Sequence, residues 1–382
     1  MPVPMPTASS SRTLYPELAP YRVHELHVSN GHVLHVEESG HPDGIAALVL
    51  HGGPGSGSSP LLRRFFDPAR YRIVCPDQRG AGKSRPRGST VNNTTDHLIA
   101  DLEALRETLG IARWLVVGGS WGAALALAYA AAHPDAVAGL QLRATFLARE
   151  QDIAGFFQAA DGEHAAAWAQ FAAVAPADQR HALLPFLASG LAGDDGTARH
   201  IALAWWRWES TLATGGVACP EPSGAQLDAQ VDRYRVQSHY LLHRCWLDTP
   251  PLLDRCHLLP KVPTLLLHGA DDSICRPEAS LAVHRRLPHS LLRIIDGAGH
   301  DPTHPAMARA TLDALDAFAA HGHFDAGRAE RRAAPKPARV PSGAEPGHGQ
   351  SSGLAVPGEG LDCKAQRGLQ GRPTYPSDEG PS

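Results

Sequence analysis

A serine flanked by glycines, Gly118-Gly119-Ser120-Trp121-Gly122, stands between an apolar run and an alanine-rich run. Residues 114–117 are predicted to form a short buried strand, and residues 122–132 a helix. A Gly-x-Ser-x-Gly segment between a strand and a helix is typical of a nucleophile elbow, although the five-residue pattern alone also occurs in ordinary turns. Glycines permit the tight turn, and the helix N-terminus offers partial positive charge to a developing anion. The sequence therefore predicts that Ser120 is a nucleophile.

An activated serine needs a base, and the base needs an acid that orients it. Downstream of the elbow, an apolar strand at residues 263–267 leads into a loop that carries Asp271 and Asp272. A second apolar strand, at residues 291–295, is followed by the glycine-containing segment Asp296-Gly-Ala-Gly-His300. The order serine, acid, histidine resembles that of α/β-hydrolases. We predict that His300 is the base and that one of the two aspartates is the acid.

A glycine-rich loop upstream of the elbow has the features of an oxyanion hole. The apolar residues 46–50 run into His51-Gly52-Gly53-Pro54-Gly55. Glycine lets a backbone N–H approach a substrate carbonyl without an intervening side chain. We expect the N–H groups of Gly53 and of Trp121, the residue after the nucleophile, to stabilise the oxyanion. Removing one such donor typically costs about a hundredfold or more in rate.

Three segments together resemble the proline iminopeptidases (prolyl aminopeptidases), serine peptidases with the α/β-hydrolase fold. They are His51-Gly-Gly-Pro-Gly55, Asp77-Gln-Arg-Gly-Ala-Gly-Lys-Ser84 and Gly118-Gly-Ser-Trp-Gly122, and the resemblance extends over about residues 13–322. It implies release of N-terminal proline from short peptides, without a metal or another cofactor. The family spacing His-Gly-x-x-Asp favours Asp272 over Asp271 as the acid.

The alternation of strands and helices predicts a mostly parallel sheet with helices on both faces. Residues 148–255 lack strand patterns, are rich in Ala, Trp and His, and are expected to form a helical cap inserted into the α/β-hydrolase fold. The core then comprises residues 1–147 and 256–323. The remaining residues 324–382 are rich in Gly, Pro and Ser, and we expect a disordered tail because they cannot bury enough apolar surface.

The resemblance also implies where the substrate binds. Glu209, in Trp205-Trp-Arg-Trp-Glu209, matches a family glutamate that binds the N-terminal ammonium. A second family glutamate, in a segment resembling Arg-Ile-Glu-x-His-Tyr-Phe, corresponds to Gln237 here, and Leu241 replaces an aromatic residue of the proline pocket. Glutamine keeps an acceptor but lacks the charge, so we expect weaker ammonium binding than in typical relatives. Further residues that match pocket positions are Arg143, Phe146 and Phe156.

Composition excludes several other classes of protein. The net charge of −4 leaves no basic footprint for nucleic acid, and no apolar run is long enough to span a bilayer. The N-terminus lacks the basic-then-apolar pattern of a secretory signal, and the six cysteines lack metal-ligand spacing. We therefore expect a cytoplasmic protein with reduced thiols and no metal. The sequence does not predict the oligomeric state.

Three functions remain open from the sequence. The first is an aminopeptidase that prefers N-terminal proline, and the second is an esterase or amidase whose cap specificity is altered at Gln237 and Leu241. The third is a non-catalytic binding protein, which has no need for a complete set of serine, acid and histidine. Epoxide hydrolase or dehalogenase chemistry is disfavoured because those relatives carry an acid where this chain has Ser120.

Overall fold

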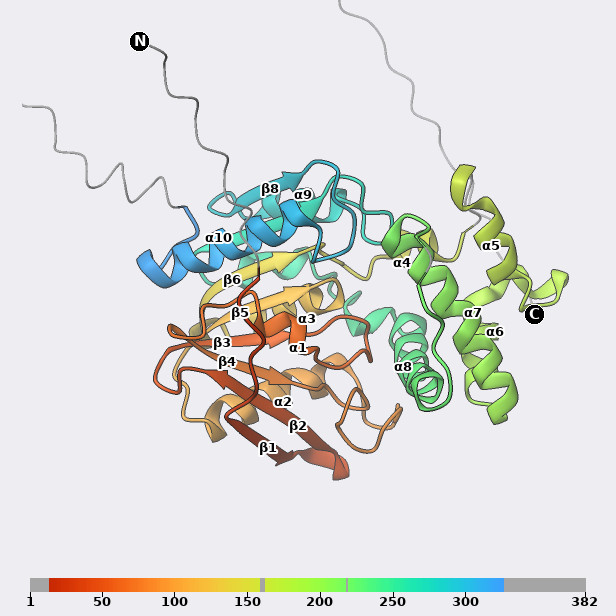
Figure 1. Ribbon diagram of the computed structural model, residues 1–382, viewed down its shortest axis with the longest axis horizontal. Coiled ribbons are helices and arrows are strands. Elements are labelled where there is room, and N and C mark those ends of the chain that lie inside the picture. Colours follow the sequence, from red (N-terminus) through yellow and green to blue (C-terminus); the bar gives the residue numbers. More distant parts are fainter. Residues whose placement is uncertain (1–13, 159–161, 218, 326–382) are drawn as a thin grey trace, which may run out of the picture. The chain divides into compact units, whose positions relative to one another are not determined.

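The structure is a computed structural model that describes residues 14–158, 162–217 and 219–325. Its described strands form one eight-stranded sheet in the order β1-β2-β4-β3-β5-β6-β7-β8 (Figure 1). The strands β1 (Arg22–His27) and β2 (Val33–Gly40) form an antiparallel hairpin, and β2 pairs antiparallel with β4 (Tyr71–Pro76). All the other neighbouring pairs are parallel.

The parallel strands are short apolar segments because helices cover both faces of the sheet. Leu48, Val116 and Leu266, one on each of three such strands, are fully buried. Strand order reverses between β3 and β5, which pair directly through Leu50 and Gly118, so loops from both strands open at one edge of the sheet. These strands are β3 (Ile45–Leu50), β5 (Trp114–Gly119), β6 (Val137–Arg143), β7 (Thr264–Gly269) and β8 (Leu291–Ile295).

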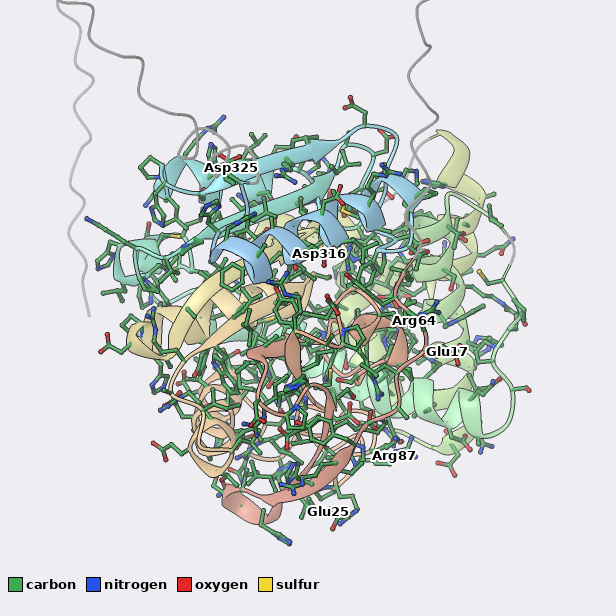
Figure 2. The ribbon with its side chains drawn as sticks, turned by 60° about the vertical axis from the view of Figure 1, so that its left-hand side comes forward. Glu17, Glu25, Arg64, Arg87, Asp316 and Asp325 are labelled. Atoms are coloured by element: carbon green, nitrogen blue, oxygen red, sulfur yellow. The ribbon has the colours of Figure 1, made fainter. Side chains whose placement is uncertain are left out.

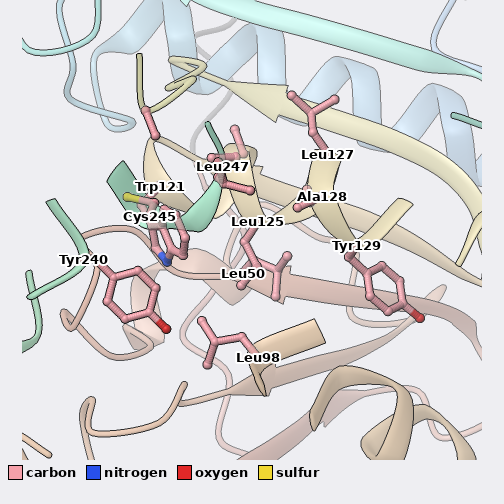
Figure 3. Close-up of a cluster of buried hydrophobic side chains, with 14 of the residues drawn as sticks. Leu50, Leu98, Trp121, Leu125, Leu127, Ala128, Tyr129, Tyr240, Cys245 and Leu247 are labelled. Atoms are coloured by element: carbon pink, nitrogen blue, oxygen red, sulfur yellow. The ribbon is translucent and has the colours of Figure 1, made fainter. Parts of the chain in front are cut away.

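Two hydrophobic clusters hold the helices against opposite faces of the sheet, since successive strand residues point to opposite sides. One contains Leu48 and Leu50 together with α2 (Thr95–Thr108), α3 (Trp121–Ala132) and α9 (Glu278–Arg286). Figure 3 shows part of this cluster, in which Leu50, Leu98 and Leu125 gather around the beginning of α3. The other contains Ala47 and Val49 with α10 (Pro305–His321). The predicted mostly parallel sheet with flanking helices is confirmed.

The segment before β1 is fastened to the face that carries α10. The hydroxyl of Tyr15 donates to Asp316 of α10 at 2.9 Å, and its carbonyl accepts from the guanidinium of Arg64 at 2.8 Å. Arg64 ends the short helix α1 (Pro60–Arg63), and Figure 2 labels both Arg64 and Asp316. The N-terminal segment therefore joins α1 to α10.

Among the described residues, five α-helices lie between β6 and β7 in the chain, and we refer to them as the cap helices (green in Figure 1). Aromatic side chains join them: Trp205 stacks on Tyr234 with ring centroids 4.8 Å apart, and Trp208 stacks on Phe171 at 6.0 Å. Such pairs combine large buried area with favourable ring geometry. The cap helices are α4 (Glu150–Phe156), α5 (Ala165–Ala172), α6 (Leu183–Leu191), α7 (Asp195–Thr214) and α8 (Ala225–Leu242).

The structure describes the first two residues, 324 and 325, of the segment that was predicted to be a disordered tail. Phe324 is buried and packs against Phe318 of α10 with ring centroids 5.0 Å apart. Packing therefore continues one residue into the segment predicted as a tail, and residues 326–382 lie outside the described residues. None of the helices that the structure describes is long and apolar enough to cross a membrane.

Ion pairs to one largely buried carboxylate, that of Glu37, fix the loops that follow β3 and β4. Glu37 of β2 accepts from Arg63, from His35 at 3.0 Å and from Lys83 at 2.9 Å. Burial by itself raises the pKa of Glu37, but its hydrogen bonds to His35 and Lys83 and the charge of Arg63 lower that pKa to about 2. Because Arg63 follows the β3 loop and Lys83 belongs to the β4 loop, one carboxylate holds both loops in place.

The segment Asp77–Ser84 adds hydrogen bonds to backbone N–H groups and a buried ion pair. Asp77 accepts the N–H of Ser58 at 2.6 Å and that of Lys83 at 2.7 Å. The guanidinium of Arg79 is fully buried and forms a two-point ion pair with Asp101 at 2.6 and 2.7 Å. This segment therefore supports the edge of the sheet at which the β3 loop and the elbow lie.

The packing of α3 on β3 generates a prediction. A Cβ added at Gly122 would lie 2.2 Å from the carbonyl oxygen of Leu50, and neither backbone can move away cheaply. We expect Gly122→Ala to lower the free energy of unfolding by about 1–3 kcal/mol, as overpacking generally does. Urea unfolding followed by circular dichroism measures the change.

The matched control for this prediction is Gly155→Ala in α4, where an added Cβ meets nothing within 4 Å. Because alanine is the better helix former, this variant should gain stability of about 0.5–1 kcal/mol. Equal stabilities of the two variants would contradict the steric argument.

Candidate active site

Ser120 occupies a strained turn between β5 and α3. Its φ of 57° and ψ of −123° lie in a region that non-glycine residues rarely adopt. The turn is held by the Ser120 N–H, which donates to the carbonyl of Arg143 at 2.9 Å. A Cβ on Gly118 would lie 2.2 Å from the carbonyl oxygen of Gly122, so the turn requires glycine there. This is the geometry of a nucleophile elbow.

His300 and Asp272 form the hydrogen bond expected of a base and its orienting acid. Nδ1 of His300 lies 2.8 Å from Oδ2 of Asp272. The other carboxylate oxygen accepts the N–H groups of Ile274 at 3.0 Å and Cys275 at 2.9 Å. Asp271, by contrast, is exposed. Of the two aspartates that the sequence left open, only Asp272 contacts the histidine in the described structure.

The surroundings of Asp272 favour its ionised form. Burial alone raises the pKa of this carboxyl, but the charge and hydrogen bond of His300 and the N–H of Cys275 together hold the pKa below its usual range. On the far side, His268 lies 3.6 Å from Oδ2 and is itself held by Ser280 and by the carbonyl of Cys275. Burial lowers the pKa of His268, so its imidazole is neutral near neutral pH.

The hydroxyl of Ser120 and the ring of His300 face the same cavity, but no hydrogen bond joins them within the described residues. Oγ of Ser120 instead lies 3.7 Å from Sγ of Cys275. Burial raises the pKa of that thiol, which is therefore neutral. In ligand-free enzymes the hydrogen bond between nucleophile and base is often long and shortens when substrate binds.

The glycine loop after β3 passes directly beside the serine. A Cβ on Gly52 would lie 3.6 Å from Cβ of Ser120, and Gly53 has a φ of 113° that favours glycine. Gln78 braces the loop, because its backbone N–H donates to Nε2 of His51 at 3.0 Å and its side-chain amide donates to the His51 carbonyl. Burial lowers the pKa of His51, in keeping with a neutral ring that accepts this bond.

Trp121 completes this side of the site. Its indole N–H donates to the side-chain oxygen of Gln78 at 2.8 Å, which ties the helix start to the glycine loop. As the first residue of α3, it has a backbone N–H without an intrahelical partner. The loop and the helix start are therefore arranged so that their N–H groups can serve one oxyanion.

A cavity of about 370 Å³ between the sheet edge and the cap helices is lined by Gly53, Ser120 and His300, among other residues. Arg143 donates to the carbonyl of His300 at 2.6 Å, so its guanidinium supports the histidine loop. Phe156 packs edge-on against Trp208 with centroids 6.3 Å apart. The sequence-predicted substrate residues all line this cavity: Arg143, Phe146, Phe156, Glu209 and Gln237.

Glu209 lies at the cap side of the cavity and already has partners. Its Oε2 accepts from Arg233 at 2.6 Å and from the hydroxyl of Tyr234 at 2.8 Å. Its Oε1 accepts a hydrogen bond from the side-chain amide of Gln237 at 3.3 Å. The side-chain oxygen of Gln237 is buried and has no hydrogen-bond partner in the described structure. The cavity thus holds one paired carboxylate beside one unpaired acceptor.

Sequence reasoning did not find Arg233 or His268. Arg233, Gln237 and Leu241 are spaced by four, which places them on one face of α8, and all three line the cavity. This spacing is visible in the sequence, but by itself it does not show which face of α8 contacts Glu209. His268 lies in a buried and mostly apolar strand. A buried polar ring is unusual there and requires hydrogen-bond partners.

The fold and the site define the class of protein to which the chain belongs. Residues 47–304 match the profile of the alpha/beta hydrolase fold, and the chain is an α/β-hydrolase. Among solved structures, VinJ aligns with a TM-score of 0.56 at 19% identity, covering 78% of this chain and 99% of that one. A proline iminopeptidase from Mycobacterium smegmatis aligns with a TM-score of 0.54 at 18% identity, covering 79% and 100%.

Sequence relatives narrow the class further. A probable proline iminopeptidase of Leptolyngbya boryana is 38% identical over 313 residues, which cover 81% of this chain and 98% of the relative. The proline iminopeptidase of Arabidopsis thaliana is 39% identical over 311 residues, which cover 79% and 81%. The chain belongs to the proline iminopeptidase family.

The contact between Asp272 and His300 yields a direct prediction. Asp272→Asn keeps the shape of the side chain but removes the charge that orients and stabilises the imidazolium. We expect kcat for hydrolysis of an activated ester or anilide to fall by about 10³–10⁴, the size of effect seen when such an acid is replaced by its amide. Steady-state kinetics measures the loss, with a thermal melt to establish that the variant is folded.

Asp271→Asn is the matched control, because it makes the same change at the exposed neighbouring residue. We expect its kcat to stay within about twofold of the unmodified enzyme, as for surface substitutions in general. Equal losses of kcat in the two variants would contradict the role assigned to the hydrogen bond between Asp272 and His300.

Proposed function

We propose that this protein is a serine aminopeptidase that releases N-terminal proline from short peptides. The observation that carries the proposal is a single cavity lined both by Ser120 and His300 and by the Glu209 carboxylate on the cap side. An exopeptidase needs both parts, since it must cleave a bond and recognise the nearby N-terminal nitrogen. The names of the relatives point to the same activity.

In the proposed mechanism, Oγ of Ser120 attacks the carbonyl carbon of the N-terminal residue while His300 takes the hydroxyl proton. Asp272 holds the imidazole and stabilises its protonated form. The N–H groups of Gly53 and Trp121 bind the oxyanion of the tetrahedral intermediate. His300 then protonates the leaving amine, the C–N bond breaks, and an acyl-enzyme remains on Ser120. Water, deprotonated by His300, releases proline and restores the serine.

The chemistry of the cap side fits an N-terminal proline. Its nitrogen is a secondary ammonium with two N–H groups, and the cavity offers two side-chain acceptors for them, Oε1 of Glu209 and Oε1 of Gln237. A primary ammonium would bring a third N–H, whose burial without a partner costs about 1–3 kcal/mol. Phe146, Phe156 and Leu241 supply apolar surface for the pyrrolidine ring.

A second function on the same scaffold is an esterase or amidase, favoured by the uncharged Gln237 at the position of a family glutamate. It uses the same acyl transfer but does not depend on an N-terminal nitrogen. Action in the cytoplasm, expected from the sequence, stays a prediction.

The two functions are separated by comparing substrates. We expect the purified enzyme to hydrolyse proline p-nitroanilide with a kcat/KM at least about tenfold above the alanine and leucine p-nitroanilides, because of the third N–H and the ring-shaped apolar surface. Parallel assays on p-nitrophenyl acetate, and on every substrate with Ser120→Ala, complete the measurement. Ester turnover that depends on Ser120, without anilide turnover, would contradict the peptidase and establish the esterase.

A further inference from the structure

The Glu209 carboxylate, which is proposed to bind the substrate's ammonium, already forms an ion pair within the protein. Arg233 donates to Oε2 of Glu209 at 2.6 Å, and both side chains are largely buried, with exposed fractions of 22% and 16%. The guanidinium also lies over the ring of Tyr234, 5.0 Å from its centroid. Burial alone lowers the pKa of Arg233, but the charge of Glu209 more than offsets this effect and raises it, so Arg233 stays charged.

The remaining charges around the cavity balance as well. Four charged side chains of the described residues line it, the carboxylates of Asp152 and Glu209 and the guanidiniums of Arg143 and Arg233. The carboxylate of Asp152 forms a two-point ion pair with Arg149 at 2.6 and 2.9 Å. Both acids that line the cavity are therefore paired with arginine, and the lining has no formal net charge.

Two buried polar atoms, on two residues of α8 that line the cavity, lack partners in the described structure. One is the acceptor Oε1 of Gln237, a residue that is 5% exposed, and the other is the donor Nε of Arg233. These residues are one helical turn apart, so both atoms belong to the same side of the helix. Buried groups of this kind are costly unless a ligand satisfies them.

We propose that Arg233 sets the substrate range of this enzyme by serving as the counter-ion of Glu209. The N-terminal nitrogen is then recognised by hydrogen bonds to Oε1 of Gln237 and Oε1 of Glu209 rather than by a net negative charge. The substrate class accordingly includes N-terminal five-membered rings with an uncharged N–H, namely lactams such as 5-oxoproline, beside proline itself. A lactam has a single N–H, which donates to the unpartnered Oε1 of Gln237, and its carbonyl gives the unpartnered Nε–H of Arg233 an acceptor. This inference rests on the proposed function and specifies its amine subsite.

The test compares kcat/KM for proline p-nitroanilide with that for 5-oxoproline p-nitroanilide. In the unmodified enzyme, we expect the two values to lie within about tenfold of each other, because no unpaired charge favours the cation. In Arg233→Gln, the freed carboxylate should raise the ratio of proline to 5-oxoproline by at least about tenfold. A smaller change in the ratio, or a change in the opposite direction, overturns the proposal.

Two further variants keep the test independent of folding. Gln237→Glu adds a negative charge while Arg233 stays in place, and it should raise the same ratio by at least about tenfold. Arg199→Gln is the matched control, because Arg199 forms another arginine–carboxylate pair between α7 and α8, with Asp228 at 2.7 Å, but on the exposed surface. Its ratio should equal that of the unmodified enzyme, and a shift as large as that of Arg233→Gln would overturn the proposal.

A binding measurement separates this inference from the proposed activity. Calorimetry on Ser120→Ala, with and without Arg233→Gln, gives the dissociation constants of prolinamide and 5-oxoprolinamide without any turnover. If the ratio of these constants shifts as expected while proline anilide is not hydrolysed, the role of Arg233 stands and the peptidase proposal fails. If hydrolysis is normal and the ratio of constants does not change, the role of Arg233 is refuted and the peptidase proposal stands.

Discussion

The close approach of α3 to the end of β3 is the constraint on which the site depends. Gly122 lies so near the carbonyl of Leu50 that no side chain fits between them. This contact places the beginning of the helix beside the loop that carries Gly52 and Gly53. The strained backbone of Ser120 is the consequence, since the chain must turn sharply from β5 into a helix that is already in place. Nucleophile, helix terminus and oxyanion loop thus share one packing requirement.

Around this point, buried polar groups act mainly to hold loops. Glu37, Asp77 and Asp101 each bind groups from segments that are distant in sequence. Asp272 has the same character, because it binds two backbone N–H groups of its own loop as well as His300. On the cap side, aromatic packing brings α7 and α8 together, and the pairing of Glu209 with Arg233 follows from that contact. The chemistry of the cavity is therefore set by which helices pack together.

The sequence predicted those parts of the site that depend on local pattern. Ser120 and His300 stand in short segments whose glycines and flanking strands suffice to indicate their roles. The choice between Asp271 and Asp272 did not follow from the residues themselves, because neighbouring residues in a loop differ only in which one turns inward. The pairing of Glu209 with Arg233 could not be predicted from a local sequence pattern, because Arg233 is 24 residues away and on another helix. The mostly parallel sheet and its flanking helices, by contrast, followed from the regular alternation of strand and helix patterns in the sequence.

The central claim is that Ser120 is the nucleophile of this α/β-hydrolase. Reaction with a fluorophosphonate, followed by proteolysis and mass spectrometry, identifies the residue that forms the covalent bond. We predict a single adduct on the peptide that contains Ser120, absent from Ser120→Ala and greatly slowed in Asp272→Asn. An adduct on Cys275 or on any other residue, or no adduct on the folded enzyme, would contradict the account.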